Sequence, residues 1–491
     1  MSPETYPSDK KWLALALLAL AQFVVVLDAS IVNVALPSIG SDLDFAPEDL
    51  SWVVNGYTLF FGGFLLLGGR MADLLGRRRM FVAGLVLFAA ASLAGGLATT
   101  PGMLIGARAV QGLGAALLSP AALALVTVMF TEGAERNKAM GVWGAVAGSG
   151  GAAGVLLGGV LTEYAGWEWV LFVNVPIGLA AAFFATRLLP ESKTTGTSTF
   201  DVAGAVSVTA GLSLLVYTLV DANDAGWTSG QTLGLGAVAL AFLAAFVVIE
   251  LRSKAPLVPF GIFKRRTITG TNIVALLVAM ALFSMFFFVS LYMQMVLGYD
   301  ALEAGLAYLP LAVGIIISAG VASSLVTRVG FKPVLIAGLV LTAAGLVWFA
   351  QVSVGGDYLS DILFPSLLAA VGLGFAFVPM TIGAVSGVSS QEAGLASGLI
   401  NTSQQIGGAL GLAILVSIAN SKTDDLMRAA GGDQAALPNA LTEGFQTAFL
   451  VGAVFAVVGA VLAATLISSK ESREHARAAQ RGDVTPAAAV A

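Results

Sequence analysis

Two residues of opposite charge lie inside apolar stretches, and their types and positions are the ones best suited to chemistry. Asp28 lies in the segment LDASIVNVALP (27–37), and Arg108 begins the segment RAVQGLGAA (108–116). A charged side chain in hydrocarbon is costly, so one that persists usually faces a polar cavity, has a partner and serves a function. We interpret Asp28 as a proton or cation site and Arg108 as its partner. The alternative is a static ion pair that joins two helices.

The two charges are predicted to lie at a similar depth in a membrane. Asp28 precedes Pro37 by nine residues, and Arg108 follows Pro101 by seven. These separations place them roughly 13 Å and roughly 10 Å below the same outer face, at 1.5 Å per residue. A guanidinium favours a neighbouring carboxylate, whereas desolvation favours the protonated acid, so a proton or a substrate can tip the balance. We therefore predict that both residues face one central cavity and are coupled, directly or through water.

Several uncharged side chains are candidates to line this cavity. Gln111 lies one turn after Arg108 on the same helical face, where it orients the cavity or makes an ordinary interhelical hydrogen bond. The stretch 269–297 is rich in Met and Phe. Such a run suits a forgiving apolar pocket or, more commonly for any one residue, packing against lipid or core. With Gln111, the predicted cavity residues are Asn33, Phe287, Gln294, Asn401, Gln404 and Gln405.

The segment GRMADLLGRRR (69–79) is predicted to be a cytoplasmic turn that latches one conformation of the protein. Gly69 and Gly76 permit a tight turn. Asp73 is expected to lie against a helix N-terminus or to pair with an arginine, and Arg77 and Arg78 complete the predicted latch. The alternative is that the arginines only keep this loop on the cytoplasmic side.

The stretch 139–162 holds glycines at intervals that bring several of them onto one helix face. Small residues four apart let helices approach closely, so packing is their basic role. A functional reading is that this seam limits leak or permits the halves of the protein to rock. The glycines are Gly141, Gly150, Gly154, Gly158 and Gly159.

The composition indicates an integral membrane protein. Of the 491 residues, 57% are hydrophobic and only 11% are charged, and the mean hydropathy is +0.90; soluble domains carry about 25% charged residues. The sequence has no cysteine, and its one histidine, His475, lies in a polar stretch. It also lacks a Walker loop, a paired-carboxylate site and a zinc pattern. We therefore expect no enzyme, no cofactor, no metal site and no nucleic-acid partner.

Fourteen apolar runs are long enough to span a bilayer. Of the 24 Lys and Arg residues, Arg108 alone lies deep in a run. The others lie in loops, in tails or, like Arg187 and Lys332, within three residues of the end of a run, and only Lys422 and Arg428 fall outside if both termini are cytoplasmic. One missed or extra helix would spoil this alternation. The runs are 12–37, 50–69, 80–99, 102–127, 139–162, 168–189, 201–221, 230–251, 269–297, 304–327, 332–352, 360–387, 393–419 and 444–468.

A weak internal repeat divides these helices into two halves. The segment SSLVTRVGFK (323–332) matches 69–79 when Gly76 is aligned with Gly330, which places Lys332 on Arg78 and Thr327 on Asp73. Repeated halves around a central site are typical of transporters. We predict six helices in 12–190, a two-helix insert in 191–262 and six helices in 263–469, with polar cytoplasmic tails at 1–11 and 470–491.

These segments resemble the fourteen-helix drug:proton antiporters of the EmrB/QacA type, in the major facilitator superfamily. The segment 27–37 matches that family's first-helix signature, 69–79 matches GxLADRxGRK, and 108–116 matches RxxQGxGAA. The glycines of 139–162 match its antiporter motif in spacing, and WEWVLFVNVPIG (167–178) resembles WRWIFLINVPIG. The chain departs from these patterns at Met71, Leu74, Val155 (for the usual proline) and Glu168 (for arginine).

The resemblance implies a major facilitator fold with two pseudo-symmetric six-helix bundles, helices 7 and 8 being the family's inserted pair. It implies alternating access in the plasma membrane, with Asp28 and Arg108 coupling export of a small hydrophobic substrate to inward proton movement. We expect a functional monomer in contact with membrane lipids. Because the thirteenth helix carries Gln404 and Gln405 but no acid, the predicted substrate is a neutral, monocationic or weakly acidic compound such as an antibiotic. The alternatives are a dedicated exporter of one self-made metabolite and, less favoured, a channel or sensor.

Overall fold

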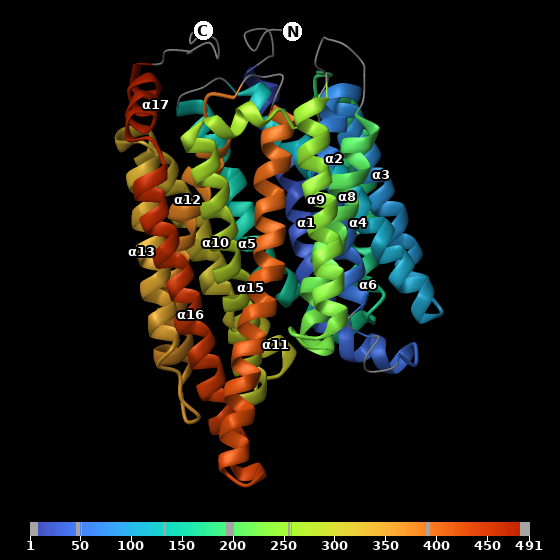
Figure 1. The fold of residues 1–491 in the computed structure, drawn as a ribbon, viewed down its shortest axis with the longest axis vertical. Helices are drawn as coiled ribbons and strands as arrows, with labels where there is room; N and C mark the ends of the chain where they lie inside the picture. Colours follow the sequence, from blue (N-terminus) through green and yellow to red (C-terminus); the bar gives the residue numbers. More distant parts are fainter. Residues whose placement is uncertain are drawn as a thin grey trace.

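The computed structural model of the protein describes residues 8–45, 50, 52–130, 134–192, 201–253, 256, 258–388 and 393–481. The regular secondary structure of these residues is helical, and the long helices run side by side (Figure 1). The start of α1 (Ser8–Asp42) and helix α17 (Ser469–Arg481) lie at the top of the view, which we call the termini side. The predicted tail at 1–11 lies mostly outside the described residues, as does the end of the tail at 470–491.

The helices of the first half precede an inserted pair. The first half contains α1 (Ser8–Asp42), α2 (Trp52–Leu75), α3 (Arg77–Gly96), α4 (Pro101–Met129), α5 (Ala134–Ala165), α6 (Trp169–Phe172) and α7 (Asn174–Leu188). The insert contains α8 (Val202–Ala225) and α9 (Gly230–Arg252). The short α6 and α7 together form a single span, Trp169–Leu188.

The second half is built from α10 to α16 and is followed by a terminal helix. Its helices are α10 (Arg266–Leu291), α11 (Ala301–Ala307), α12 (Leu309–Val329), α13 (Phe331–Phe349), α14 (Phe364–Ala384), α15 (Ala393–Ala429), α16 (Leu437–Leu466) and α17 (Ser469–Arg481). Short 3₁₀ segments occur at η2 (Phe260–Lys264) and η5 (Gln434–Ala436), and π-helical segments at η3 (Tyr292–Val296) and η4 (Tyr358–Leu363).

The predicted number of spans is confirmed for the part of the chain that the structure describes. Thirteen helices are long and apolar enough to cross a membrane, and the bent pair Ala134–Gly151 and Ala153–Ala165 brings the number to 14. The bend in α5 is 42° and lies in its glycine-rich stretch, although Val155 replaces the proline of the family motif. Glycine removes the side-chain packing that keeps a helix straight, so a helix can bend here without proline.

Helices α15 and α16 extend further than the apolar runs 393–419 and 444–468 predicted. They form a hairpin that projects beyond the other helices on the side opposite the termini (Figure 1). The Nζ atom of Lys422 lies 3.4 Å from Glu443 within this extension, and Arg428 pairs with Asp425. The two basic residues that depart from the charge alternation therefore lie on a polar projection, where acids neutralise them.

The first part of the predicted polar tail at 470–491 is helical, because residues 469–481 form α17. This helix packs against α12 and α13. Ser472, Ala476 and Ala479 are buried and share one face at a spacing of four and three residues. The buried face consists of small side chains in an otherwise charged sequence. The mean polarity of the segment therefore does not reveal that it forms an amphipathic helix.

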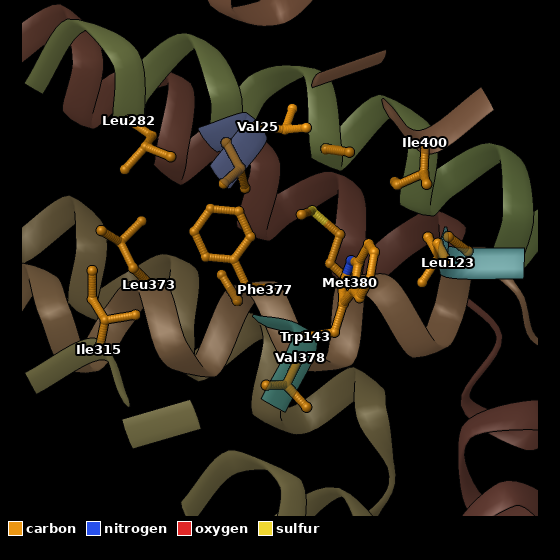
Figure 2. Packing of buried hydrophobic residues seen from close by; sticks show 14 of the residues in the cluster. Val25, Leu123, Trp143, Leu282, Ile315, Leu373, Phe377, Val378, Met380 and Ile400 are labelled. Atoms are coloured by element: carbon orange, nitrogen blue, oxygen red, sulfur yellow. The ribbon is translucent and has the colours of Figure 1, made fainter. Parts of the chain in front are cut away.

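The bundles meet through a shared apolar core. Helix α2 and helix α4 contact α15, whereas α5 contacts α12 and α14. Figure 2 shows Val25, Leu123 and Trp143 of the first half packed among Leu282, Ile315, Leu373, Phe377, Val378, Met380 and Ile400 of the second. Between helices that span a bilayer, such contacts stabilise through van der Waals packing, because lipid is as apolar as these side chains.

The inserted pair lies against the seam between α2 and α15. Helix α8 contacts both of these helices as well as α9. A Cβ at Gly63 would lie 3.1 Å from the Cβ of Ser213, so a glycine is needed for α2 and α8 to approach so closely. Trp52 of α2 also stacks on Tyr217 of α8, with ring centroids 5.5 Å apart.

Candidate functional site

Asp28 of α1 and Arg108 of α4 contact each other directly. The Nη1 atom of Arg108 donates to Oδ2 of Asp28 at 2.6 Å. The side chains are 0% and 1% exposed. The prediction that they face a central cavity is therefore wrong for this conformation, since both are enclosed within the first bundle.

Two amides complete the surroundings of the Asp28 carboxylate. Gln111 Nε2 and Asn174 Nδ2 donate to Oδ1 of Asp28 at 2.8 Å and 2.7 Å. Both amides also donate to Ser92 Oγ, at 2.8 Å and 3.0 Å. The carboxylate oxygens thus face donors from α4 and α7, which is the geometry that an ionised carboxylate makes. We call Asp28, Ser92, Arg108, Gln111 and Asn174 the Asp28 network.

Further contacts fix the position of the Arg108 guanidinium. Its Nε donates to the backbone oxygen of Val53 at 3.0 Å, and Nη1 also donates to Gln111 Oε1 at 2.6 Å. The guanidinium lies 4.5 Å from the ring centroid of Tyr57, a cation–π arrangement. Tyr57 in turn donates to the backbone oxygen of Val25 at 3.3 Å, which joins α2 to α1.

Apolar clusters enclose the network on both sides. The main core contains Val24, Val25 and Tyr57 on the side toward the termini. A second cluster covers the opposite side with Leu27, Ile31, Val32, Ala35, Ile39, Phe45, Val53, Ala98, Leu104, Trp167, Val170 and Leu171. Hydrogen bonds and charge interactions are stronger in such a low-dielectric setting, and an unpaired charge there is correspondingly costly.

Sequence reasoning missed Ser92, Asn174 and Tyr57. Asn174 stands within the segment 167–178, and Ser92 interrupts the apolar stretch 80–99. Neutral polar side chains in spans usually find partners on neighbouring helices. That rule provides a signal for both residues, but it does not say which partner each one finds.

The predicted cavity residues separate into groups. Gln111 belongs to the Asp28 network. Asn401 is buried between the bundles, where Ser119 Oγ of α4 lies 3.5 Å from its Oδ1. Gln404 and Gln405 of α15 are half-buried, and Gln405 lies against Gly62 of α2.

The other three predicted cavity residues are exposed. Asn33 donates to Ala29 of its own helix, and Gln294 donates to Ser290. The Phe287 ring packs edge-on against Phe288 and is 37% exposed.

The residues of the predicted latch connect the two bundles on the termini side. Asp73 Oδ1 accepts from Arg77 Nε at 3.1 Å and from Arg77 Nη2 at 2.6 Å. Asp73 Oδ2 accepts from the backbone N–H of Leu395, in the first turn of α15, at 2.9 Å. Both contacts that were expected of Asp73 are thus present together. A carboxylate at a helix N-terminus is favourable because it satisfies a free N–H there and complements the dipole.

The rest of the turn between α2 and α3 contacts the end of α7. Gly76 has φ +115°, and a Cβ there would lie 2.5 Å from Glu191 Oε1. Arg78 donates to the backbone oxygen of Leu189 at 3.2 Å, and its Nε lies 3.5 Å from Glu191. Gly69 lies close to Gly398 of α15, where a Cβ on Gly398 would be 3.6 Å from the Gly69 Cα.

The turn between α12 and α13 repeats this arrangement, but its contact to the other bundle is made by neutral groups. Gly330 has φ +91°, and Lys332 Nζ donates to the backbone oxygens of Ala464 and Ile467 at 2.7 Å each, at the end of α16. Thr327 Oγ1 accepts from Asn137 Nδ2 of α5 at 2.9 Å. The predicted alignment of Lys332 with Arg78 and of Thr327 with Asp73 thus corresponds to matching places in the fold.

The glycines of α5 lie where other helices approach it. A Cβ at Gly150 would be 2.8 Å from Val26 Cγ1, and one at Gly154 or Gly158 would be 2.6 to 2.7 Å from the backbone oxygens of Leu27 or Ile31. Gly141 faces Ser323 of α12, and Gly159 is buried. This seam therefore holds α5 against the turn of α1 that carries Asp28.

Comparison with known proteins identifies the family. A model described as Major Facilitator Superfamily matches residues 18–412. The chain belongs to this superfamily. It is a membrane transporter with the fourteen-helix form of the fold.

Its relatives include proteins named for antibiotic resistance and export. The chain is 39% identical to the puromycin resistance protein pur8 of Streptomyces alboniger, over 98% of this chain and 96% of that one. It is 42% identical to the cephamycin export protein CmcT of Amycolatopsis lactamdurans, over 92% of both chains. The human organic anion transporter MFSD10 shares the fold alone, with a TM-score of 0.65, 15% identity and coverage of 93% of this chain and 100% of that one.

Proposed function

We propose that the protein exports an antibiotic or a similar hydrophobic compound across the plasma membrane in exchange for protons, with both termini in the cytoplasm. The observation that carries this proposal is the Asp28 network, in which a buried carboxylate accepts from two amides and a guanidinium. Intramembrane carboxylates of this kind mark proton relays in transporters. The names of the resistance and export relatives support the class of substrate.

The mechanism starts from the ionised state of Asp28. Protonation removes the negative charge that Arg108 pairs with, which leaves a buried guanidinium without its counter-ion. The first bundle then rearranges to give Arg108 new partners or to hydrate it. Opening of the termini side requires the hydrogen bond between Asp73 and the start of α15 to break. Proton uptake and the change of access are thereby linked through helices that share these contacts.

A second candidate is a dedicated exporter of a single natural product. Relatives named for one antibiotic, such as cephamycin or tetracenomycin C, favour it. A substrate panel separates the two candidates, because a dedicated exporter transports one chemical family and a multidrug exporter transports many.

The test is gradient-driven transport in proteoliposomes, with puromycin and a cephamycin as the first probes. Wild-type protein is expected to transport at least one probe saturably and faster when a pH gradient is imposed. Asp28→Asn should abolish the response to the gradient while substrate exchange without a gradient persists. The control is Asp425→Asn on the exposed end of α15, which should match wild type. A gradient response that survives in Asp28→Asn overturns proton coupling through this residue, and strong export of divalent cations overturns the substrate class.

A further inference from the structure

The two amides that hold Asp28 differ in what their oxygen atoms contact. Gln111 Oε1 accepts from Arg108 Nη1 at 2.6 Å. Asn174 Oδ1 is buried without a hydrogen-bond partner among the described residues, although the side chain is 0% exposed. Buried polar atoms are seldom left unpaired, and one at a candidate functional site calls for an explanation.

Because Asn174 Oδ1 has no partner, a turn of the amide breaks no bond made by this oxygen, and the two bonds that Nδ2 donates are exchanged for two that Oδ1 accepts. With Asp28 ionised, Asn174 Nδ2 donates to Asp28 Oδ1 at 2.7 Å and to Ser92 Oγ at 3.0 Å. A half-turn of the amide about its terminal bond would place Oδ1 toward both groups. That orientation is repulsive against a carboxylate, but it accepts an O–H from a protonated acid, and the Ser92 hydroxyl can donate as well as accept.

Gln111 cannot make the same change, because turning its amide would break its bond to Arg108. Arg108 has donors only, so it can still donate to Oδ2 of a protonated Asp28 but cannot accept the new O–H. Among the described groups that bond to the carboxylate, Asn174 is therefore the one that can both donate to the ionised form and accept from the protonated form.

Few of the groups that surround Asp28 can change their protonation state with pH. The charged or titratable groups that face it among the described residues are Arg108 of α4 and the phenol of Tyr57 of α2. Helices α3 and α7 present the neutral Ser92 and Asn174, and α5 presents Gly154 beside the same turn of α1.

We propose that Asn174, supported by Ser92, is a positioning residue for proton coupling that holds Asp28 in both of its protonation states by turning its amide. The proton binds Asp28 Oδ1, and the N–H···O bond from Asn174 is exchanged for an O–H···O bond to Asn174, with no other covalent change. This inference rests on the proposed role of Asp28 in proton coupling.

The test is the pH profile of transport in proteoliposomes for Asn174→Leu, which has similar volume and no polar atoms. The substitution removes the N–H that stabilises the ionised form of Asp28 and the oxygen that stabilises its protonated form. The ionised form loses more, because hydrogen bonds to a charged group are the stronger. The midpoint of the profile should therefore move to higher pH by about one unit, a tenfold change in proton concentration. The concentration of probe drug at half-maximal rate should change by less than about twofold, since Asn174 contacts Asp28 rather than the bundle interface.

Matched variants separate the possible outcomes. Gln231→Leu removes an exposed amide in the first turn of α9 that donates to Asp221 of α8 at 2.8 Å, and it should leave the profile in place. Ser92→Ala should move the midpoint in the same direction as Asn174→Leu but by less. If Asn174→Leu does not fold, Asn174→Ala, which also removes both the donor and the acceptor, is judged by the same midpoint.

An unchanged midpoint in a folded Asn174 variant, or a lower rate with no shift, overturns the proposal and leaves Asn174 a structural residue. Loss of proton coupling as such is tested by Asp28→Asn. A wild-type gradient response that Asp28→Asn retains would refute the proposed function, whatever the Asn174 variants do.

Discussion

The turns α2–α3 and α12–α13 occupy matching places in the two bundles, yet they hold the opposite bundle by different chemistry. Asp73 of the first turn places a carboxylate against the start of α15 and pairs with the buried Arg77. Thr327 of the second turn meets Asn137 near the start of α5 through a neutral hydrogen bond. The first contact between bundles therefore depends on charge, and the second does not.

What the turns share shows which features the repeat requires. Each has a glycine with positive φ, Gly76 or Gly330, which lets the chain reverse between two helices. Each has a cation two residues later, Arg78 or Lys332, that donates to the backbone at the end of the last helix of its own half. These features build the turn itself, whereas the residue three before the glycine decides how the other bundle is held.

The second turn also has a support that the first lacks in the described part of the chain. Helix α17 brings His475 Nε2 to within 2.9 Å of Asn137 Oδ1, and Gln480 donates to the backbone oxygens of Thr327 and Arg328. Ser472 Oγ accepts from the backbone N–H of Lys332 at 3.0 Å. A terminal helix thus reinforces the neutral contact.

The largest effect should come from Asp73→Ala. The variant removes the carboxylate that pairs with Arg77, a side chain only 3% exposed, and breaking a buried pair costs about 3–5 kcal/mol. Thermal unfolding in detergent should show this loss, and transport should fall with it. Glu443→Gln, which removes an exposed partner of Lys422, is the control and should change stability by less than about 1 kcal/mol. Equal stability of the two variants would mean that the first turn is not held by charge.

Deleting residues 469–491 should weaken the second contact selectively. The deletion removes three or more hydrogen bonds that support the turn, each worth about 1 kcal/mol. Because the natural sequence has no cysteine, a pair introduced as Gly141→Cys and Ser323→Cys reports the α5–α12 contact. A second pair, Gly69→Cys and Gly398→Cys, reports the α2–α15 contact.

In the truncated protein, cross-linking of the first pair should slow severalfold, and cross-linking of the second pair should be unchanged. Equal slowing of both pairs would show that α17 stabilises the whole protein rather than the second turn.

The sequence alone predicts some features of the fold and of the site, and it leaves others undetermined. The depth of Asp28 and Arg108 followed from helix geometry, and the number of spans followed from charge alternation, because both depend on residues whose position in a membrane is strongly constrained. The α17 helix was missed because its buried face is made of Ser472, Ala476 and Ala479, which carry little apolar signal. Asn174 and Gln111 show the same limit, since a neutral amide in a span has many possible partners, and only packing selects one.

The smallest effect should come from Thr327→Val, which keeps the shape of the side chain and removes its hydroxyl. Asn137 Nδ2 loses its acceptor, but the Asn137 side chain keeps the contact with His475. The expected loss of stability is about 1 kcal/mol, the typical net value of a neutral hydrogen bond. Combined with deletion of α17, the same substitution should cost more than it does alone, because Asn137 would then lose both partners and be left unsatisfied. Additive losses would show instead that the hydroxyl and the terminal helix support the second turn independently.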